Sequence, residues 1–477
     1  MKEDYGVCIL GAGISGLSSA QILMERGVDV VVVEQNGKVG GLAKTYSAGE
    51  FKFDLGGHRF FSNNKVISEY FKKITGDELI WVNRKSRIYY NSKYFSYPLK
   101  LSDVITKINP YQGLKIMIGY VFAIFNYQIR KKEIGNVEEW LVSRFGRELY
   151  KIFFKNYTEK VWGIPCQDIS KDWAAQRIKE MSVFEAIKNI FIKTKNKPVS
   201  LIDSFMYCNF GIGEFSYQLV EKIGKENIKV NSEVKEIKVR GGRVESVVVG
   251  NKDNREEIKV EHVLSSIPLT RLIELISPKV PEDILRAAKQ LRYRSIVVVA
   301  VFIDQEIAIE DTWLYIQDRR VKMTRIHAPQ NWSKNLVPKG KTSLIIEYPC
   351  FYRDELWNMS DTQLGELAIE ELKLLDILNI KNILSTTVTR ERYAYPIYHM
   401  GYRDNRKRIL DYIQKNIGNL EMIGRTGRFQ YYNMDHCIET GIKAALNLTG
   451  HHYDIEKINK KERYLEKGWE VDEKCKK

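Results

Sequence analysis

The N-terminal segment carries the feature that most constrains how this chain can fold. An apolar run over residues 7–10 leads into Gly11-Ala12-Gly13-Ile14-Ser15-Gly16, and a helix-like stretch follows. A second apolar run over residues 28–33 then ends at Glu34. A strand, a glycine-rich turn, a helix and a second strand that ends at an acidic residue form the β-α-β unit that binds dinucleotides. The sequence therefore predicts a nucleotide-binding α/β domain at the start of the chain.

The residues of this unit have separate physical roles. Gly11 permits the tight turn, Gly13 lets a pyrophosphate approach the backbone, and Gly16 lets the helix pack close to the strand. The free N–H groups at the start of the helix face the phosphates, and we assign Ser15 in this turn to the same site. Glu34 suits a ribose 2′-hydroxyl and would repel a 2′-phosphate.

A second glycine pair indicates which dinucleotide binds. Gly40-Gly41-Leu42 begins six residues after Glu34. A glycine pair at this place resembles the extended fingerprint of two-domain flavoproteins that bind FAD. The alternative is an ordinary glycine turn that leaves the second strand. We predict FAD as the cofactor, held noncovalently.

Composition places the chain among globular proteins with more than one domain. Its 477 residues are too many for one ordinary core, and 44% hydrophobic with 28% charged residues is typical of a globular protein. The apolar runs are too short to cross a bilayer, and no leader-like segment precedes the first strand, so we expect a cytoplasmic protein. Six scattered cysteines predict reduced thiols and no metal site: Cys8, Cys166, Cys208, Cys350, Cys437 and Cys475.

The formal net charge of +15 favours anionic partners. The sequence holds no nucleic-acid-binding module and no stripe of alternating aromatic and basic residues, so we expect no nucleic acid among the partners. An apolar run over residues 116–125, followed by Arg130-Lys131-Lys132, leaves a weak association with an anionic membrane surface open. The oligomeric state is open as well, a homodimer included.

Periodicity along the chain predicts discontinuous domains. A helical pattern is clearest over residues 137–154, and residues 228–239 and 243–249 read as a hairpin. Strand patterns that predict an antiparallel sheet lie at 295–303, 312–317, 322–326 and 342–347. We expect an α/β fold with these parts: 1–85, 196–270 and 401–453 as three segments of the FAD-binding domain, 86–195 as a mainly helical domain, 271–400 as an antiparallel-sheet substrate domain, and 454–477 as a charged helical tail.

Four further segments, in order over most of the chain, share the motifs of one family. They are Phe53-Asp54-Leu55-Gly56-Gly57-His58-Arg59, Tyr157-Thr158-Glu159-Lys160-Val161-Trp162-Gly163, Thr324-Arg325-Ile326, and Gly424-Arg425-Thr426-Gly427-Arg428-Phe429-Gln430-Tyr431-Tyr432-Asn433-Met434-Asp435. These segments resemble UDP-galactopyranose mutase and its flavoprotein relatives in the amine oxidase and protoporphyrinogen oxidase superfamily. The resemblance implies a FAD domain, a helical domain and an antiparallel sheet.

The resemblance also implies the roles of individual residues. Arg325 and Arg425 would hold a substrate diphosphate, which agrees with the bidentate geometry that guanidinium groups offer to phosphates. The residues implied to be catalytic are His58, Arg325, Arg425 and Tyr431, and those that bind substrate are Trp162, Arg325, Tyr395, Arg425 and Tyr431. The predicted cofactor site comprises Gly11, Gly13, Ser15, Gly16, Glu34, Gly40, Gly41, Leu42, Gly57, His58, Gly424, Arg425 and Asp435.

Several positions depart from the mutase pattern, all on the substrate side. The segment Ser265-Ser266-Ile267-Pro268 is closer to the oxidase branch of the superfamily than to the mutases. Phe61 replaces a histidine, Phe184 stands where a basic residue is expected, and Asn433 replaces an aspartate. The cofactor prediction is therefore firmer than the substrate prediction.

Three functions remain open from the sequence. The first is a mutase-like enzyme that uses reduced flavin on a sugar nucleotide or another diphosphate-linked sugar, with the arginines stabilising the departing diphosphate. The second is a net oxidoreductase that removes hydride from an amine, a porphyrinogen or an isoprenoid. The third is a non-enzymatic nucleotide-binding protein. We favour the first, with a small anionic molecule as the substrate.

Overall fold

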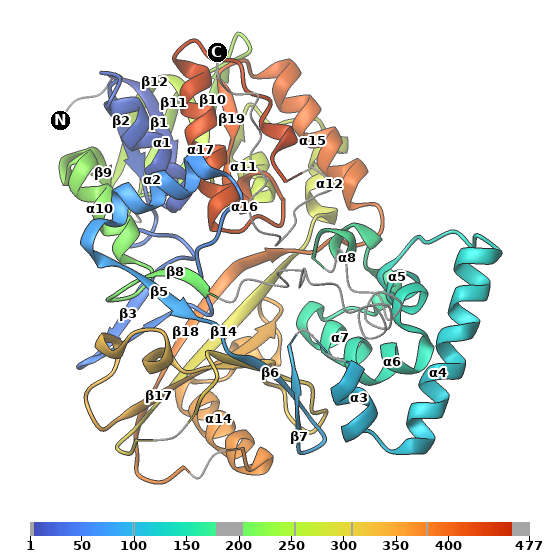
Figure 1. Cartoon of the computed structure of the whole chain (residues 1–477). Helices are drawn as coiled ribbons and strands as arrows, with labels where there is room; N and C mark the ends of the chain where they lie inside the picture. Colours follow the sequence, from blue (N-terminus) through green and yellow to red (C-terminus); the bar gives the residue numbers. More distant parts are fainter. Residues whose placement is uncertain are drawn as a thin grey trace.

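The computed structural model describes residues 4–97, 99, 101–177, 204–251, 254–306, 309–377 and 380–459. Figure 1 shows three parts: an upper part with one large sheet between helices, a lower part with a second large sheet, and a lobe of helices at the right. Two sequence-based expectations lie outside the described residues, namely the helical tail from residue 460 onward and the helical pattern over 178–195, which includes Phe184.

The upper sheet contains the predicted β-α-β unit. Its central strands β1, β2, β12 and β19 are parallel, and β10, β11 and β12 form an antiparallel meander at one side. The strand order is β13-β10-β11-β12-β1-β2-β9, with β19 also paired to β12. The strands are β1 (Asp4–Leu10), β2 (Val30–Val33), β9 (Ile228–Lys229), β10 (Glu233–Arg240), β11 (Arg243–Gly250), β12 (Arg255–Ser265), β13 (Ile276–Ser277) and β19 (Leu420–Met422).

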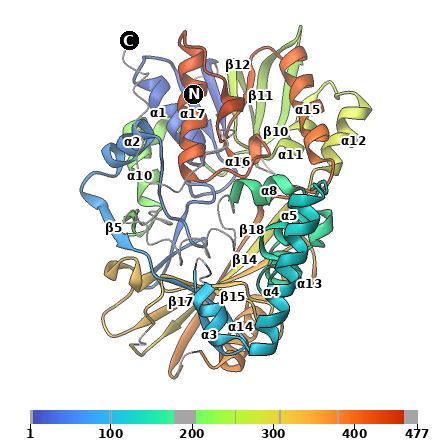
Figure 2. The same cartoon turned by 45° about the vertical axis from the view of Figure 1, so that its right-hand side comes forward.

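Helices cover both faces of this sheet, as Figures 1 and 2 show. Strand β2 is four buried valines, because a parallel strand that is covered on both sides has no polar face. One face packs against α1 (Ile14–Met24), α2 (Lys65–Thr75), α10 (Glu214–Ile223) and α17 (Met434–Leu448). The other packs against α11 (Leu269–Leu275), α12 (Glu282–Gln290) and α15 (Tyr402–Asn416).

The lower sheet has the strand order β18-β14-β17-β16-β15-β6-β7. Its strands are β6 (Ser86–Tyr90), β7 (Lys93–Ser96), β14 (Tyr293–Ile303), β15 (Trp313–Ile316), β16 (Arg325–His327), β17 (Thr342–Cys350) and β18 (Ile383–Pro396). The expected antiparallel pairing holds throughout except at β15 and β6, which pair in parallel. Helix α14 (Asp361–Leu375) covers one face, and the short helix α13 (Glu355–Asn358) follows β17.

The helical lobe lies beside the lower sheet in both views (Figures 1 and 2). It consists of α3 (Leu101–Lys107), α4 (Pro110–Ile124), α5 (Val137–Phe145), α6 (Arg147–Tyr150), α7 (Asn156–Trp162) and α8 (Lys171–Arg177). Its apolar core includes Trp140, Leu141 and Phe153, and it continues to Ile88 and Phe95 of the lower sheet.

Two small sheets and one short helix complete the described strands and α-helices. They are β3 (Thr45–Ala48) with β4 (Phe51–Asp54), β5 (Leu79–Asn83) with β8 (Ser204–Cys208), and α16 (Gly424–Gly427). The expected strand over residues 228–239 is broken into β9 and β10. Asn231, with φ 52°, adopts the left-handed conformation, so the chain turns there: β9 pairs with β2, and β10 forms the predicted hairpin with β11.

Candidate active site

A cavity of about 720 Å³ opens at the carboxyl ends of the parallel strands. Gly11, Glu34 and Ser266 directly follow β1, β2 and β12, and all three line this cavity. Ligands of open α/β sheets bind at this edge of the sheet, and the volume lies within the usual range of about 300–1,000 Å³ for small-molecule sites.

The predicted glycines form a phosphate cradle in which Gly16 has no space for a side chain and Gly13 has space only toward the cavity. A Cβ on Gly16 would lie 2.1 Å from the carbonyl oxygen of Gly11, so close packing of α1 on the turn excludes a side chain there. A Cβ on Gly13 would have Gly41 Cα as its nearest protein neighbour, at 3.7 Å. Gly13 also lines the cavity, so the side chain would conflict with a ligand and not with the protein.

Glu34 is held in the cavity wall by backbone and side-chain donors. The backbone N–H of Ala12 donates to its Oε2 at 3.0 Å, and the backbone N–H and side-chain amide of Asn36 donate to its Oε1 at 2.9 and 2.8 Å. A carboxylate oxygen can accept two hydrogen bonds, and Oε2 accepts one here. The carboxylate is thus oriented by the protein and keeps acceptor capacity for ribose hydroxyls.

Most of the residues predicted for the cofactor line this cavity, but three do not. Those that line it are Gly11, Gly13, Ser15, Glu34, Gly40, Gly41, Leu42, His58, Gly424 and Arg425. Gly16 lies behind the turn, and a Cβ on Gly57 would lie 2.4 Å from Cε1 of His327. Asp435 is buried in the first turn of α17, beside Nδ1 of His436 at 3.2 Å.

The cavity also contains residues that the sequence reasoning missed. Glu391, Arg392 and Tyr393 line it from the end of β18, and Lys44 follows the second glycine pair. Burial raises the pKa of the Glu391 carboxyl, and Lys44 opposes this shift. No local motif marks these positions; the one available signal is that Glu391 is an acidic residue two positions before Tyr393-Ala394-Tyr395.

His58 lines the cavity as a neutral side chain. Burial, and then the nearby Arg425 guanidinium, lower the pKa of the imidazole to about 4. Its buried Nδ1 has no hydrogen-bond partner within the described part of the chain. At neutral pH the ring therefore offers an unoccupied polar atom to a ligand without adding a charge.

The residues predicted to bind substrate form one group next to His58 and Arg425. The rings of Tyr395 and Tyr431 stack with centroids 5.6 Å apart at 14°, and Trp162 meets both of them edge-on at 6.2 and 6.0 Å. Arg425 lies over both tyrosine rings at 5.3 and 5.5 Å. Arg325 donates to the Tyr395 hydroxyl at 3.3 Å. Except for Arg425, these residues adjoin the cavity and do not line it.

A buried carboxylate that the sequence did not suggest neutralises Arg325. Glu347 on β17 is fully buried, forms an ion pair with Arg325, and contacts Nε2 of His327. Burial alone would raise the pKa of this carboxyl, but Arg325 and His327 outweigh burial and lower it to about 2. The two arginines outnumber the one carboxylate, Glu347, and the neutral His58 adds no charge, so this side of the site keeps a positive charge.

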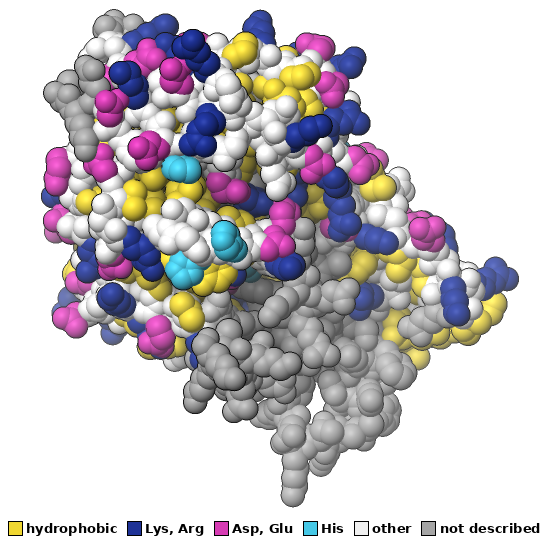
Figure 3. All heavy atoms as spheres, turned by 90° about the horizontal axis from the view of Figure 1, so that it is seen from above, with side chains coloured by type: hydrophobic (Ala, Val, Ile, Leu, Met, Phe, Trp, Pro, Cys, Tyr) yellow, Lys and Arg dark blue, Asp and Glu magenta, His cyan; other side chains and the backbone are white. Residues whose placement is uncertain are grey.

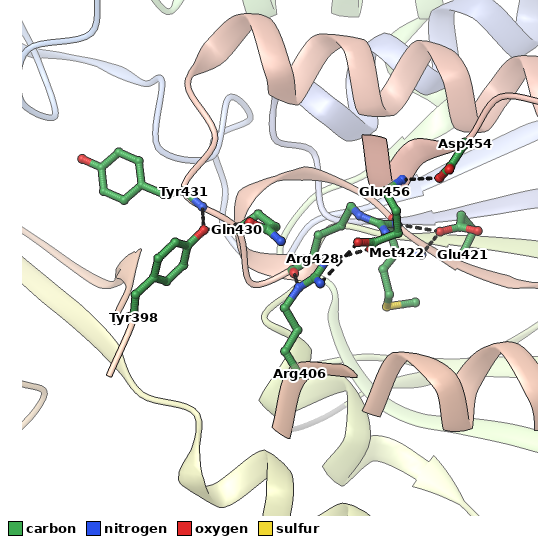
Figure 4. A network of polar contacts seen from close by, with 9 residues as sticks. All are labelled: Tyr398, Arg406, Glu421, Met422, Arg428, Gln430, Tyr431, Asp454 and Glu456. Atoms are coloured by element: carbon green, nitrogen blue, oxygen red, sulfur yellow. Dashed lines mark hydrogen bonds and ion pairs between the residues drawn. The ribbon is translucent and has the colours of Figure 1, made fainter. Parts of the chain in front are cut away.

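The segment from Gly424 to Asn433 contains two arginines with different roles: Arg425 lines the cavity, and Arg428 stabilises the loop. Figure 4 shows Arg428 enclosed by Glu421 and Glu456, while the Tyr431 side chain points away from this cluster. Arg428 binds Glu421 at 2.9 Å and the Met422 carbonyl at 2.8 Å, and Arg406 donates to the Arg428 carbonyl at 2.7 Å. These contacts fix the loop, whereas the Arg425 guanidinium, held by the Tyr432 carbonyl at 2.7 Å, reaches the cavity.

The motif at residues 157–163 likewise contains one residue with a structural role, Lys160, and one beside the site, Trp162. Lys160 is half-buried and donates to the carbonyls of Asp318, Val321 and Met323 at 2.8–2.9 Å, which ties the helical lobe to the lower sheet. Burial lowers the pKa of this ammonium to about 8. Trp162, two residues later, instead meets the tyrosine pair.

Comparison with known proteins identifies the family. The sequence profile of flavin-containing amine oxidoreductases matches residues 14–449. The chain belongs to this family. Members bind FAD, and the glycine cradle, the oriented Glu34 and the unpartnered Nδ1 of His58 all fit such a cofactor. The enzyme is therefore FAD-dependent, as the sequence predicted.

Individual relatives cover parts of the chain. A stretch of 170 residues, 34% of this chain, is 28% identical to a probable UDP-galactopyranose mutase of Klebsiella pneumoniae and spans 42% of it. A stretch of 314 residues, 61% of this chain, is 23% identical to an L-amino-acid oxidase of Sistrurus catenatus edwardsii and spans 56% of it. The chain thus spans about half the length of these relatives.

Solved structures confirm the predicted fold class. Reduced UDP-galactopyranose mutase matches with a TM-score of 0.83 at 20% identity over 96% of both chains. Cyclohexylamine oxidase from Brevibacterium oxydans matches with a TM-score of 0.65 at 16% identity over 93% of this chain. Within the described residues, no helix is long and apolar enough to cross a membrane, and no group of side chains forms a metal site.

Proposed function

We propose that this flavoenzyme acts on a sugar joined to a diphosphate, and that it isomerises this substrate without net oxidation. The observation that carries the proposal is the pair of guanidinium groups, Arg325 and Arg425, which meet at Tyr395 beside the flavin cavity. One carboxylate, Glu347, balances them only in part. A site with residual positive charge and planar donors favours phosphate oxygens.

The same geometry disfavours a cationic amine as the substrate. The stacked rings of Tyr395 and Tyr431 would attract a cation, but the Arg425 guanidinium already lies over both rings. A protonated amine between these rings would meet a like charge. This argument supports the isomerase over an amine oxidase; oxidation of an uncharged substrate stays the alternative that the experiment tests.

The chain's own residues would act by electrostatics and positioning. A bound reduced flavin would supply an electron pair for chemistry at the sugar carbon, in a reaction that consumes no electrons overall. Arg325 and Arg425 would stabilise negative charge on the diphosphate as it departs. Trp162 closes the other side of the tyrosine pair, and His58 offers Nδ1 as a neutral hydrogen-bonding atom.

Buried free thiols such as Cys8 and Cys208 support a reducing compartment, and we retain the cytoplasm as the proposed location.

Turnover by the reduced and oxidised holoenzyme tests the reaction type. Purified protein is incubated with UDP-galactopyranose, other sugar nucleotides and a polyprenyl diphosphate sugar, with and without dithionite. We expect an isomeric product that forms only with reduced flavin and consumes no acceptor. Consumption of oxygen or of a dye by an amine, a porphyrinogen or an isoprenoid, with no isomer formed, would replace the proposal by the oxidase alternative.

Calorimetry with UDP tests the role of the arginines. Removing one partner of a buried charge pair costs about 2–5 kcal/mol, so Arg425→Ala should weaken UDP binding by roughly thirtyfold or more. Arg425→Lys should recover part of the loss, because an ammonium keeps the charge but not the planar fork. Arg390→Ala, which removes an ion pair with Asp361 elsewhere on the sheet, is the matched control and should leave binding unchanged. Equal effects of Arg425→Ala and Arg390→Ala would contradict the assignment.

A further inference from the structure

Helix α4 and the helical turn after it expose an apolar face to solvent. Of the eighteen large hydrophobic side chains that are exposed among the described residues, eight fall between Tyr111 and Ile129. They are Tyr111, Leu114, Met117, Ile118, Val121, Phe122, Phe125 and Ile129. Isolated exposed apolar residues are normal, but a contiguous group of this kind marks an interaction surface.

The spacing of these side chains places them on one side of the helix. At 100° per residue the six of them that lie on α4 cover an arc of about 140°, whereas the buried residues Ile116, Tyr120 and Ala123 point in the opposite direction, into the lobe. A surface helix of a globular protein normally presents polar residues where α4 presents Leu114, Val121 and Phe122. The exposed face is therefore not a by-product of packing the lobe. In Figure 1, α4 stands at the outer edge of the molecule.

Basic residues border this face, and acidic residues are missing from its sequence. Residues 104–132 contain five lysines or arginines and no aspartate or glutamate. Lys115 lies over the Tyr111 ring at 4.3 Å, and Arg130 over the Phe125 ring at 4.8 Å, so these cations sit at the margin of the apolar surface. Figure 3 shows yellow and dark blue side chains together at its right-hand edge, on the side where Figure 1 places α4.

We propose that the exposed face of α4 is a docking surface for an anionic lipid bilayer. A 15-residue helix is too short to span a bilayer, so it would lie in the plane of the interface with its apolar side chains among the acyl chains. Lys115, Arg130 and Lys131 would then reach the lipid phosphates. A second copy of this chain is the less complementary occupant, because a twofold contact would oppose these cations with their own counterparts and supply no acidic residue.

Vesicle flotation of the full-length holoenzyme tests this proposal. We expect binding to phosphatidylcholine vesicles that contain 30% phosphatidylglycerol, little binding to phosphatidylcholine alone, and weakening as salt is raised. Val121→Asp should reduce binding by at least about tenfold. Lys115→Gln, which leaves the helix and its packing intact, should reduce it by about fivefold. Retention of bound flavin checks that each variant is folded.

The matched control is Val66→Asp on α2, a valine with 71% exposure compared with 66% for Val121. It should bind vesicles like the wild type. Wild-type protein that fails to bind anionic vesicles, or that binds neutral vesicles equally well, would overturn the proposal. An equal loss with Val66→Asp would overturn it too. If the wild type is dimeric and Val121→Asp monomeric while neither binds vesicles, the face is a contact between copies and the lipid assignment is wrong.

Discussion

Replacement of Glu347 by glutamine tests the electrostatics of the candidate site most directly. This carboxylate is fully buried between Arg325 and His327. Glu347→Gln keeps the shape of the side chain but removes the charge that compensates the partly buried guanidinium of Arg325. The variant therefore separates the charge of the carboxylate from its volume.

The pKa gives the expected magnitude. The carboxyl titrates near 2 in the folded chain and near 4.5 as an isolated side chain, a difference of 2.5 units. At 1.36 kcal/mol per unit this corresponds to about 3 kcal/mol, which agrees with the roughly 3–5 kcal/mol typical of breaking a buried ion pair. Because the folded pKa is depressed, the contribution is complete above about pH 4.5 and is lost as the pH falls through 2.

Thermal unfolding measured by circular dichroism at pH 7 is the assay. With about 2.1 cal/mol/K of unfolding entropy per residue, 477 residues give about 1 kcal/mol/K, so Tm should fall by about 3 °C if the chain unfolds as one unit. The control is Glu69→Gln, which removes an exposed ion pair with Lys72 and should change Tm by less than about 1 °C. Equal shifts in the two variants would refute the reasoning, as would a Glu347→Gln deficit that stays constant between pH 7 and pH 3.

Two further predictions concern the cofactor site. Gly13→Val should fold but lose flavin, because a Cβ at Gly13 has no protein atom closer than 3.7 Å and the side chain would enter the cavity. Gly16→Ala should lower stability, because its Cβ would lie 2.1 Å from a carbonyl oxygen. Flavin absorbance together with a melting curve separates the two effects; a Gly13→Val variant with full flavin content would disprove the cradle. The pKa of His58 is lowered to about 4 in the folded protein, so its contribution to stability is complete above pH 6.5 and is lost as the pH falls through 4. The imidazole of the folded protein itself stays neutral until the pH approaches 4. Flavin retention should therefore stay level from pH 8 to pH 5.5 in the wild type and in His58→Gln, and a wild-type step near 6.5 that His58→Gln lacks would contradict this.

The parts of the site that could be predicted from sequence depend on short-range geometry. The turn from Gly11 to Gly16 and the acidic end of β2 lie within one β-α-β unit, so their spacing alone determines where they meet. Arg425 and Tyr431 could be assigned only by resemblance, because their motif comes to the cavity from the far end of the chain. Spacing could not separate Arg425 from Arg428 either: they are three residues apart, yet one reaches the cavity and the other is enclosed by carboxylates.

The parts that the sequence missed depend on contacts between distant segments. Glu347 is the one charged residue of β17, and only the pairing of β16 with β17 brings it to Arg325. The parallel pairing of β15 with β6 joins residues more than 220 positions apart, and no periodicity in either strand indicates a partner. Lys160 belongs to the same motif as Trp162, but its ammonium donates three hydrogen bonds to carbonyls of the loop at 318–323 and takes no part in the site.

The packing of α1 against α17 has a consequence for how the protein is made. The Ser19 hydroxyl lies 3.1 Å from the Gly441 carbonyl oxygen, and a side chain on Gly441 would strike the Ser15 carbonyl at 2.3 Å. The helix that starts the phosphate cradle is thus covered by the last long helix of the described chain. At about 5–20 residues per second, roughly 400 further residues leave α1 uncovered for about 20–80 s during translation. A chain that ends before Met434 lacks α17, so the apolar surface that α17 covers on α1 stays exposed. We expect such truncated chains to be insoluble even when their other domains are complete.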